Sequence, residues 1–132
     1  MSGGALLRPE RPYESRVELL LDVATLVLQG PSVDDAALPL YCLDPDGRSI
    51  LATPAEIAAA KCAECQKHSI LAARKALDRG HRVELVVSNT GRPDEHMWIR
   101  VDGIPDDPSV KAGMPPPPDD MRVGAVIVEI RR

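Results

Sequence analysis

The stretch KCAECQKHSILAARKAL, residues 61–77, gathers two cysteines and a histidine near the expected start of a helix. Cys62 and Cys65 are three positions apart, and His68 follows after three more. Such a set could hold a metal ion, form a redox pair, or supply one nucleophilic thiolate beside a second cysteine without a chemical role. The N–H groups at a helix N-terminus favour a thiolate, and Cys65 falls where that help is strongest. Both cysteines could equally be small apolar residues of a packed turn.

The redox and metal interpretations each lack part of their usual pattern. A thioredoxin-like C-x-x-C pair follows a strand within a βαβ unit, whereas a short predicted helix precedes Cys62. The candidate zinc ligands are Cys62, Cys65 and His68, with Cys42, His81 or His96 as the fourth. Structural zinc sites usually take two paired clusters at short spacing, and the second pair is missing here.

A nucleophilic cysteine needs a base and an acid that orients the base. His68 lies one helical turn beyond Cys65, along the side of the helix, where a solvated ring is expected; His81 lies at the far end of that helix. His96 opens a predicted strand, and a strand packed on the helix could bring its ring to the sulfur. The acids that could hold the other ring nitrogen are Asp102, Asp106 and Asp107.

The elements that must position these residues follow from apolar spacing and from start and stop signals. Helical spacing predicts a helix over 13–29 that ends at Gly30-Pro31. The capping box TPAE (53–56) opens a brief helix, and the next helix runs over 65–79 to a cap at Gly80. Strands are predicted over 82–88, 96–101 and 123–130, with a short apolar stretch at 38–43, a turn at 44–47 and a short extended piece at 49–52.

The order of these elements indicates an α+β fold, with helices on one side of a small antiparallel sheet whose strands form a meander. The stretch between the last two strands is too rich in proline to predict regular structure, and PPPP (115–118) is typical of polyproline II. Residues 1–12 are expected to be a flexible arm, and residues 13–132 a single domain.

Several motifs in this order resemble the transglutaminase-like (papain-like) cysteine hydrolases, in particular the short type encoded among bacteriophage structural genes. The matching stretches, which span about residues 40–110, are YCLDPDG (41–47), LATPAE (51–56), AEC (63–65), ILAARKALDRG (70–80), VELVV (83–87), HMWIRV (96–101) and DPS (107–109). The resemblance implies a papain-like fold in which the nucleophile stands at a helix N-terminus.

Carried over by position, the resemblance makes Cys65 the nucleophile, His96 the general base and Asp107 the acid. Cys62 has no counterpart in the family pattern. The interval from His96 to Asp107 is shorter than in the family, so Asp102 and Asp106 stay open as the acid. No metal and no cofactor is implied.

The function implied is cysteine-dependent acyl transfer or amide hydrolysis on a protein or peptide substrate, in a virion-associated phage protein. The acyl group could pass to water or to a lysine amine. The alternative is a catalytically inactive structural or interaction protein that uses the same fold and contacts other virion proteins.

Composition limits the other functional classes. A net charge of −4 disfavours general binding to nucleic acid or to an anionic membrane surface. No apolar run reaches the roughly 20 residues that span a bilayer, and the first residues lack the order of a secretory signal. An odd number of cysteines, three, favours a reducing compartment over a disulfide framework. Host cytoplasm or virion is therefore the expected location.

Overall fold

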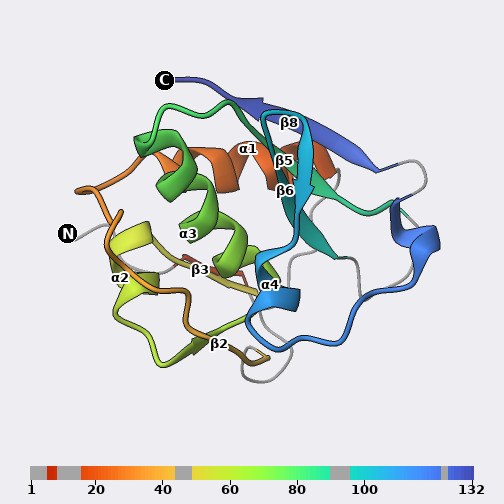
Figure 1. Cartoon of the computed structure of the whole chain (residues 1–132), viewed down its shortest axis with the longest axis horizontal. Coiled ribbons are helices and arrows are strands. Elements are labelled where there is room, and N and C mark those ends of the chain that lie inside the picture. The colour runs from red at the N-terminus through yellow and green to blue at the C-terminus, as the bar shows by residue number, and fades with distance from the viewer. Residues whose placement is uncertain (1–5, 9–15, 44–48, 90–95, 123–124) are drawn as a thin grey trace.

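The structure, a computed structural model, describes residues 6–8, 16–43, 49–89, 96–122 and 125–132 (Figure 1). The helices in these ranges are α1 (Arg16–Val27), α2 (Pro54–Ala58), α3 (Cys65–Asp78) and α4 (Pro108–Lys111), followed by a 3₁₀ turn, η2 (Asp119–Arg122). The strands are β1 (Leu6–Arg8), β2 (Leu40–Tyr41), β3 (Ser49–Leu51), β4 (Cys62–Ala63), β5 (Val83–Val87), β6 (Met97–Val101), β7 (Ile104–Asp106) and β8 (Val126–Ile130). The predicted mixed α+β class is confirmed.

The main sheet has the strand order β7-β6-β5-β8, and all of its neighbours are antiparallel. β8 pairs with β5 and not with β6, so the predicted meander is wrong. The reason is the tight β6–β7 hairpin, whose turn residues Asp102 and Gly103 take the positive φ angles of 51° and 82°. This hairpin occupies the second edge of β6, and the last strand must therefore take the second edge of β5.

One face of this sheet carries α1 and α3, which lie together beside it (Figure 1). α3 packs on β6 and β5, and α1 packs on β5 and β8. Alternation along β5 turns Val83, Leu85 and Val87 toward the two helices. They meet a core of Leu, Val, Ile and Ala that includes Leu20 of α1 and Ile70 of α3.

Arg74 ties the two core helices together. Its guanidinium donates to the carbonyl of Val27, the last residue of α1, and to those of Gln29 and Gly30 just beyond it. It also pairs with Asp78 one turn further along α3. Because a helix leaves its last carbonyls unpaired, this buried arginine acts as a cap for α1 from a different helix.

Two small strand pairs lie apart from the main sheet. β1 pairs antiparallel with β3, and β2 pairs parallel with β4. Within the stretch expected to be a flexible arm, Leu6–Arg8 thus form a strand, and the other residues of 1–12 lie outside the described residues. The predicted turn at 44–47 and nearly all of the loop at 89–95 also lie outside them.

The proline-rich stretch after β6 contains regular structure that its composition did not indicate. It forms β7, α4 and η2. The start of α4 is marked by Asp107, whose side chain accepts a hydrogen bond from the Val110 N–H, and by Pro108 in the first turn. An N-cap aspartate followed by proline is a helix start signal, and here it outweighs the proline content.

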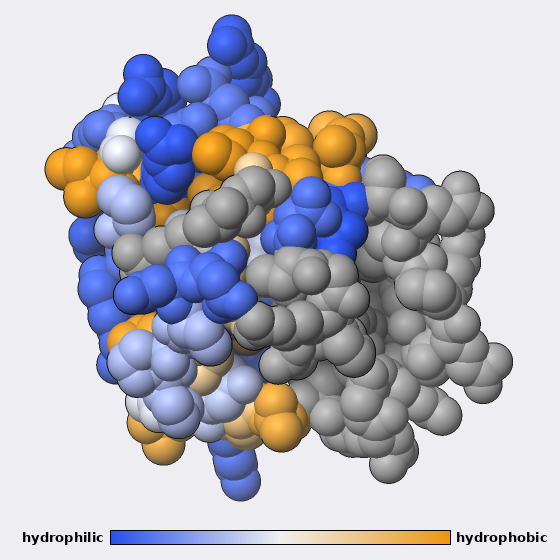
Figure 2. Space-filling view, turned by 90° about the vertical axis from the view of Figure 1, so that its right-hand side faces the viewer, coloured by the Kyte–Doolittle hydropathy of each residue, from blue (hydrophilic) through white to orange (hydrophobic). Residues whose placement is uncertain are grey.

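Some large apolar side chains reach the surface. They include Val17 and Leu21 on α1 and Ile127 on β8. Figure 2 shows hydrophobic atoms gathered in the upper part of the face that it presents. No helix within the described ranges is long and apolar enough to cross a membrane.

Candidate active site

A cleft of about 370 Å³ brings together residues from distant parts of the chain. Cys65 and His96 both line it. The other lining residues are Tyr41, Leu43, Glu64, Met114, Pro115, Pro116, Pro117, Pro118 and Met121. The cleft therefore combines a thiol, an imidazole and a carboxylate with a wall of proline and methionine.

Cys65 is the first residue of α3, as the sequence predicted. The preceding residue, Glu64, is the N-cap, and its Oε1 accepts hydrogen bonds from the N–H groups of Gln66 and Lys67. The other carboxylate oxygen of Glu64 lies 3.5 Å from Cys65 Sγ and accepts from the thiol. The N-cap residue of α3 thus also accepts a hydrogen bond from the Cys65 thiol.

The pKa of the Cys65 thiol is raised well above its ordinary value. Burial of the thiol is the main cause, and the negative charge of Glu64 is the next. A hydrogen bond from the Met97 backbone acts in the opposite direction without outweighing them. The helix N-terminus was expected to favour the thiolate, whereas desolvation and the adjacent carboxylate favour the neutral thiol.

His96 is fixed by its backbone just before β6. Its N–H donates to Ser88 Oγ at 2.8 Å, and its carbonyl accepts from the Ser88 N–H at 2.9 Å. The ring is buried and stacks on Trp98, with ring centroids 5.7 Å apart. The next residue, Met97, is the one whose backbone bonds to the Cys65 thiol, so the start of β6 lies against the start of α3.

Asp107 bonds to the imidazole of His96. Asp107 Oδ2 lies 2.7 Å from His96 Nε2, and its Oδ1 accepts from the Val110 N–H in α4. A carboxylate can only accept, so Nε2 carries the proton in the neutral ring and Nδ1 has the open lone pair. The structure brings these two predicted residues into contact and places Cys65 on the same cleft as His96.

The other two candidate acids lie away from the His96 ring. Asp102 sits in the β6–β7 turn and accepts from His81 Nδ1 at 2.7 Å and from the Arg82 N–H. The bond from the Arg82 backbone and then that from His81 hold the pKa of Asp102 below its usual value. Asp106 pairs with Lys111 at 2.6 Å. Of the three acids, Asp107 is the one that contacts His96.

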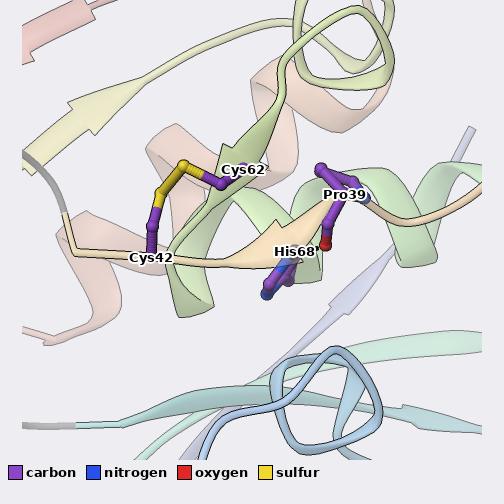
Figure 3. The surroundings of a disulfide bond; sticks show 4 residues. All are labelled: Pro39, Cys42, Cys62 and His68. Carbon is purple, nitrogen blue, oxygen red and sulfur yellow. Dashed lines mark hydrogen bonds between the residues drawn. A yellow bond between two sulfur atoms is a disulfide. The ribbon is translucent and has the colours of Figure 1, made fainter.

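His68 is fully buried, in contrast to the solvated ring that was expected. Its Nδ1 lies 2.8 Å from Ser109 Oγ, and its Nε2 lies 2.8 Å from the Pro39 carbonyl oxygen (Figure 3). α4 and the chain before β2 cover this side of α3, which is why the ring does not reach water.

Cys62 forms a disulfide with Cys42, which joins the end of β2 to β4 (Figure 3). Cys65 is left as the free cysteine. This pairing excludes two alternatives, a Cys62–Cys65 redox pair and a zinc site that uses Cys42 or Cys62. It also corrects one expectation, because an odd number of cysteines did not preclude a disulfide. The odd count showed that one cysteine had to stay unpaired, but spacing could not show which one. The ground for expecting a reducing compartment is thereby removed.

Sequence reasoning gave no role to several residues that line the cleft. Tyr41 is one of them, and burial, followed by the nearby Cys65 and Glu64, raises the pKa of its phenol. The proline run and Met121 close the cleft from a segment more than forty residues after Cys65 along the chain. No sequence signal links this segment to Cys65, since only the folded chain brings the two together.

No protein-family model matches the chain, and neither the curated proteins nor the solved structures yield a match. Within the described residues, no group of three or more His, Cys, Asp or Glu side chains is arranged to hold a metal ion.

Proposed function

We propose that this protein catalyses cysteine-dependent acyl transfer or amide hydrolysis, with Cys65 as nucleophile, His96 as general base and Asp107 as the acid that orients it. The proposal includes a papain- or transglutaminase-like arrangement, in which a helix N-terminus meets the start of a strand. The observation that carries it is the 2.7 Å bond between Asp107 and His96 Nε2 beside a cleft that Cys65 also lines.

The first half of the reaction starts from a neutral thiol, because the pKa of Cys65 is raised. As the sulfur attacks an acyl carbon, the thiol proton passes to Nδ1 of His96, and Asp107 stabilises the resulting imidazolium through Nε2–H. The backbone N–H of Cys65, at the start of α3, is proposed to donate to the oxyanion; such a donor is worth about 3 kcal/mol in comparable sites. His96 then protonates the leaving group, and a thioester remains on Cys65.

In the second half, His96 takes a proton from the acceptor, which attacks the thioester and releases Cys65 as a thiol. With water as acceptor the reaction is hydrolysis, and with a lysine amine it is cross-linking. The proline and methionine wall suits a peptide with apolar side chains next to the acyl group. Such a substrate fits the proposed setting, a virion-associated protein that acts on protein partners.

The second candidate is a non-catalytic docking module of a phage particle. The observation that favours it is the raised pKa of Cys65, because a thiol that stays protonated near neutral pH is a weaker resting nucleophile. The two candidates differ in whether His96 assists the thiol.

The test uses p-nitrophenyl acetate as acyl donor and iodoacetamide as thiol probe, with peptide mass mapping to assign the modified residue. The disulfide protects Cys42 and Cys62, so the thiol signal comes from Cys65. We expect Cys65 to be acetylated and then turned over, and we expect His96→Ala to slow acetylation by about a hundredfold. Asp107→Asn should slow it as well.

The matched control is His81→Ala. His81 also forms a 2.7 Å pair with an aspartate, but it is exposed and does not line the Cys65 cleft. This variant should react like the unmodified protein. Equal rates in the His96→Ala and His81→Ala variants would establish the docking module instead.

A further inference from the structure

We infer that His68 is a positioning residue for this site, one that holds the cleft wall at Tyr41 and the acid Asp107 in place through two buried hydrogen bonds. The inference rests on the proposed function. It concerns a buried histidine that takes no part in the chemistry described above, and it assigns that histidine to the support of the acid Asp107 and of a residue that lines the cleft.

The first link reaches the cleft wall. His68 Nε2 lies 2.8 Å from the carbonyl oxygen of Pro39, two residues before Tyr41, and Figure 3 shows this carbonyl directed at the ring. The ring of Tyr41 lies near that of His68, with centroids 6.2 Å apart. Since β2 has only two residues, it depends on such outside contacts to stay in register.

The second link reaches the acid. His68 Nδ1 lies 2.8 Å from the hydroxyl oxygen of Ser109, which is fully buried in α4. Ser109 is two residues after Asp107, the N-cap of the same helix. A helix of four residues is not stable by itself, so its placement must come from contacts with the rest of the protein. The bond from His68 to Ser109 therefore holds the start of α4 in place, and with it the Asp107 carboxylate that bonds to His96.

The two links require one protonation state of His68. A carbonyl oxygen only accepts, so Nε2 must carry the proton that goes to Pro39. In the neutral ring Nδ1 then accepts from the Ser109 hydroxyl. Burial lowers the pKa of His68, which favours this neutral form. The ring thus acts as a donor toward β2 and as an acceptor toward α4.

A further backbone bond closes the arrangement. The Tyr41 N–H donates to the carbonyl of Ala112, the residue that ends α4. β2 and α4 are therefore bonded to each other. His68 on α3, the helix that begins with Cys65, bonds to Ser109 of α4 and to Pro39, the residue directly before β2. His68 therefore connects α3, which carries Cys65, to α4, which follows Asp107, and to β2, which carries Tyr41.

The test separates positioning from general stability with Ser109→Ala, which breaks only the link to α4. The readout is the ¹⁵N spectrum of the His96 ring, which reports which nitrogen carries the proton. In the unmodified protein we expect the Nε2–H form, held by Asp107. In Ser109→Ala we expect a mixture of both tautomers, and at least tenfold faster exchange of the Nε2–H proton with solvent.

The matched control is Ser69→Ala. Ser69 is the neighbour of His68, is also fully buried, and its hydroxyl has no hydrogen-bond partner within the described structure. It should leave the His96 spectrum unchanged. In His68→Gln the glutamine can donate to Pro39 and accept from Ser109, so the His96 ring should keep its Nε2–H form. In His68→Leu both bonds are lost, and the His96 ring should show a mixture of tautomers.

The outcomes distinguish the two claims. An identical His96 spectrum in Ser109→Ala and Ser69→Ala would overturn the positioning inference, even in a fully active protein. A His96 spectrum that responds to Ser109→Ala supports it, whatever the acylation assay shows. Failure of the proposed function is read separately, from the reactivity of Cys65 in the His96→Ala variant.

Discussion

Glu64 has two effects on Cys65 that oppose each other. As the N-cap of α3 it orders the turn that presents the thiol, and as a carboxylate 3.5 Å from the sulfur it raises the pKa of that thiol. A glutamine at this position would keep a side-chain carbonyl to accept from the Gln66 and Lys67 N–H groups. It would remove the charge, and its NH2 group would replace the oxygen that accepts from the Cys65 thiol.

We therefore expect Glu64→Gln to lower the pKa of the Cys65 thiol. The thiolate form then appears at lower pH, so the pH profile of Cys65 alkylation should move toward lower pH, and the rate at pH 8 should rise several-fold. Iodoacetamide kinetics with mass mapping measure this. The control, Glu84→Gln on β5, removes a carboxylate that pairs with Arg100 at 3.6 Å and does not line the cleft. A profile that stays the same in Glu64→Gln would contradict the expected charge effect.

At the level of single residues, the sequence indicated which residues belong to the candidate site, but it did not indicate their burial or their bonding partners. The resemblance and the helix start pointed to Cys65, His96 and Asp107, and the last two are in contact. Three environments could not be predicted: the half-buried position of Cys65 in the cleft, the full burial of His68, and the choice of Cys42 as partner of Cys62. Each of these depends on contacts between segments that are distant in sequence, such as the packing of α4 on α3. Such contacts cannot be predicted from residue type.

Among the elements, β2 is a two-residue strand that is held by a disulfide and by several hydrogen bonds at its ends. The Cys42–Cys62 disulfide follows it, the Pro39–His68 bond precedes it, and the Cys42 N–H donates to the Ala63 carbonyl. Two of the cleft residues, Tyr41 and Leu43, flank Cys42. The disulfide therefore connects one wall of the cleft to the strand that leads into α3.

Replacing both disulfide cysteines, Cys42→Ser with Cys62→Ser, should lower the free energy of unfolding by about 3 kcal/mol. The bond spans 20 positions, and a cross-link over that span removes this much loop entropy from the unfolded chain. Urea denaturation followed by circular dichroism gives the value. Cys65→Ala, which removes a cysteine without a cross-link, serves as the control. A loss in the double variant no larger than in the control would show that β2 is held by its hydrogen bonds alone.

The longer elements were predicted well from local signals, and so were the short helix α2 and the short strand β3, whereas other short elements were missed. The capping box at Thr53 forms as expected, with the Thr53 N–H donating to Glu56 at 3.0 Å, and α3 begins and ends within a residue of its predicted bounds. β4, β7 and α4 contain two to four residues each, too few for a periodic pattern to appear. Tertiary contacts define these short elements, and two of them carry or adjoin the candidate site.

For the molecule as a whole, the strand order was the feature that the sequence-based prediction got wrong. Strand positions follow from local patterns, whereas the pairing of β8 with β5 depends on which edges remain after the β6–β7 hairpin has formed. That pairing also puts β5 at the centre, with α1 and α3 both packed on it. A shared central strand predicts that helices and sheet unfold together.

We expect one cooperative unfolding transition in urea. The tryptophan signal comes from Trp98, which stacks on His96, while circular dichroism follows the whole chain, so the two transitions should coincide. Leu85→Ala, in the middle of β5, should move both transitions together and cost about 2–5 kcal/mol. Ile127→Ala, at an exposed position of β8, is the control. A tryptophan transition at lower urea would mean that the site region opens before the core.

The four consecutive prolines along the cleft bear on the choice of inhibitors. Proline has no backbone N–H, so this wall offers carbonyl oxygens and ring carbons but no main-chain donors. A compound that rests against the prolines can donate its own amide N–H or hydroxyl groups to their carbonyl oxygens, whereas its carboxylates and ketones find no backbone donor on these four residues. Inhibitor libraries for this cleft are best weighted toward donor-rich, apolar scaffolds that carry a thiol-reactive group.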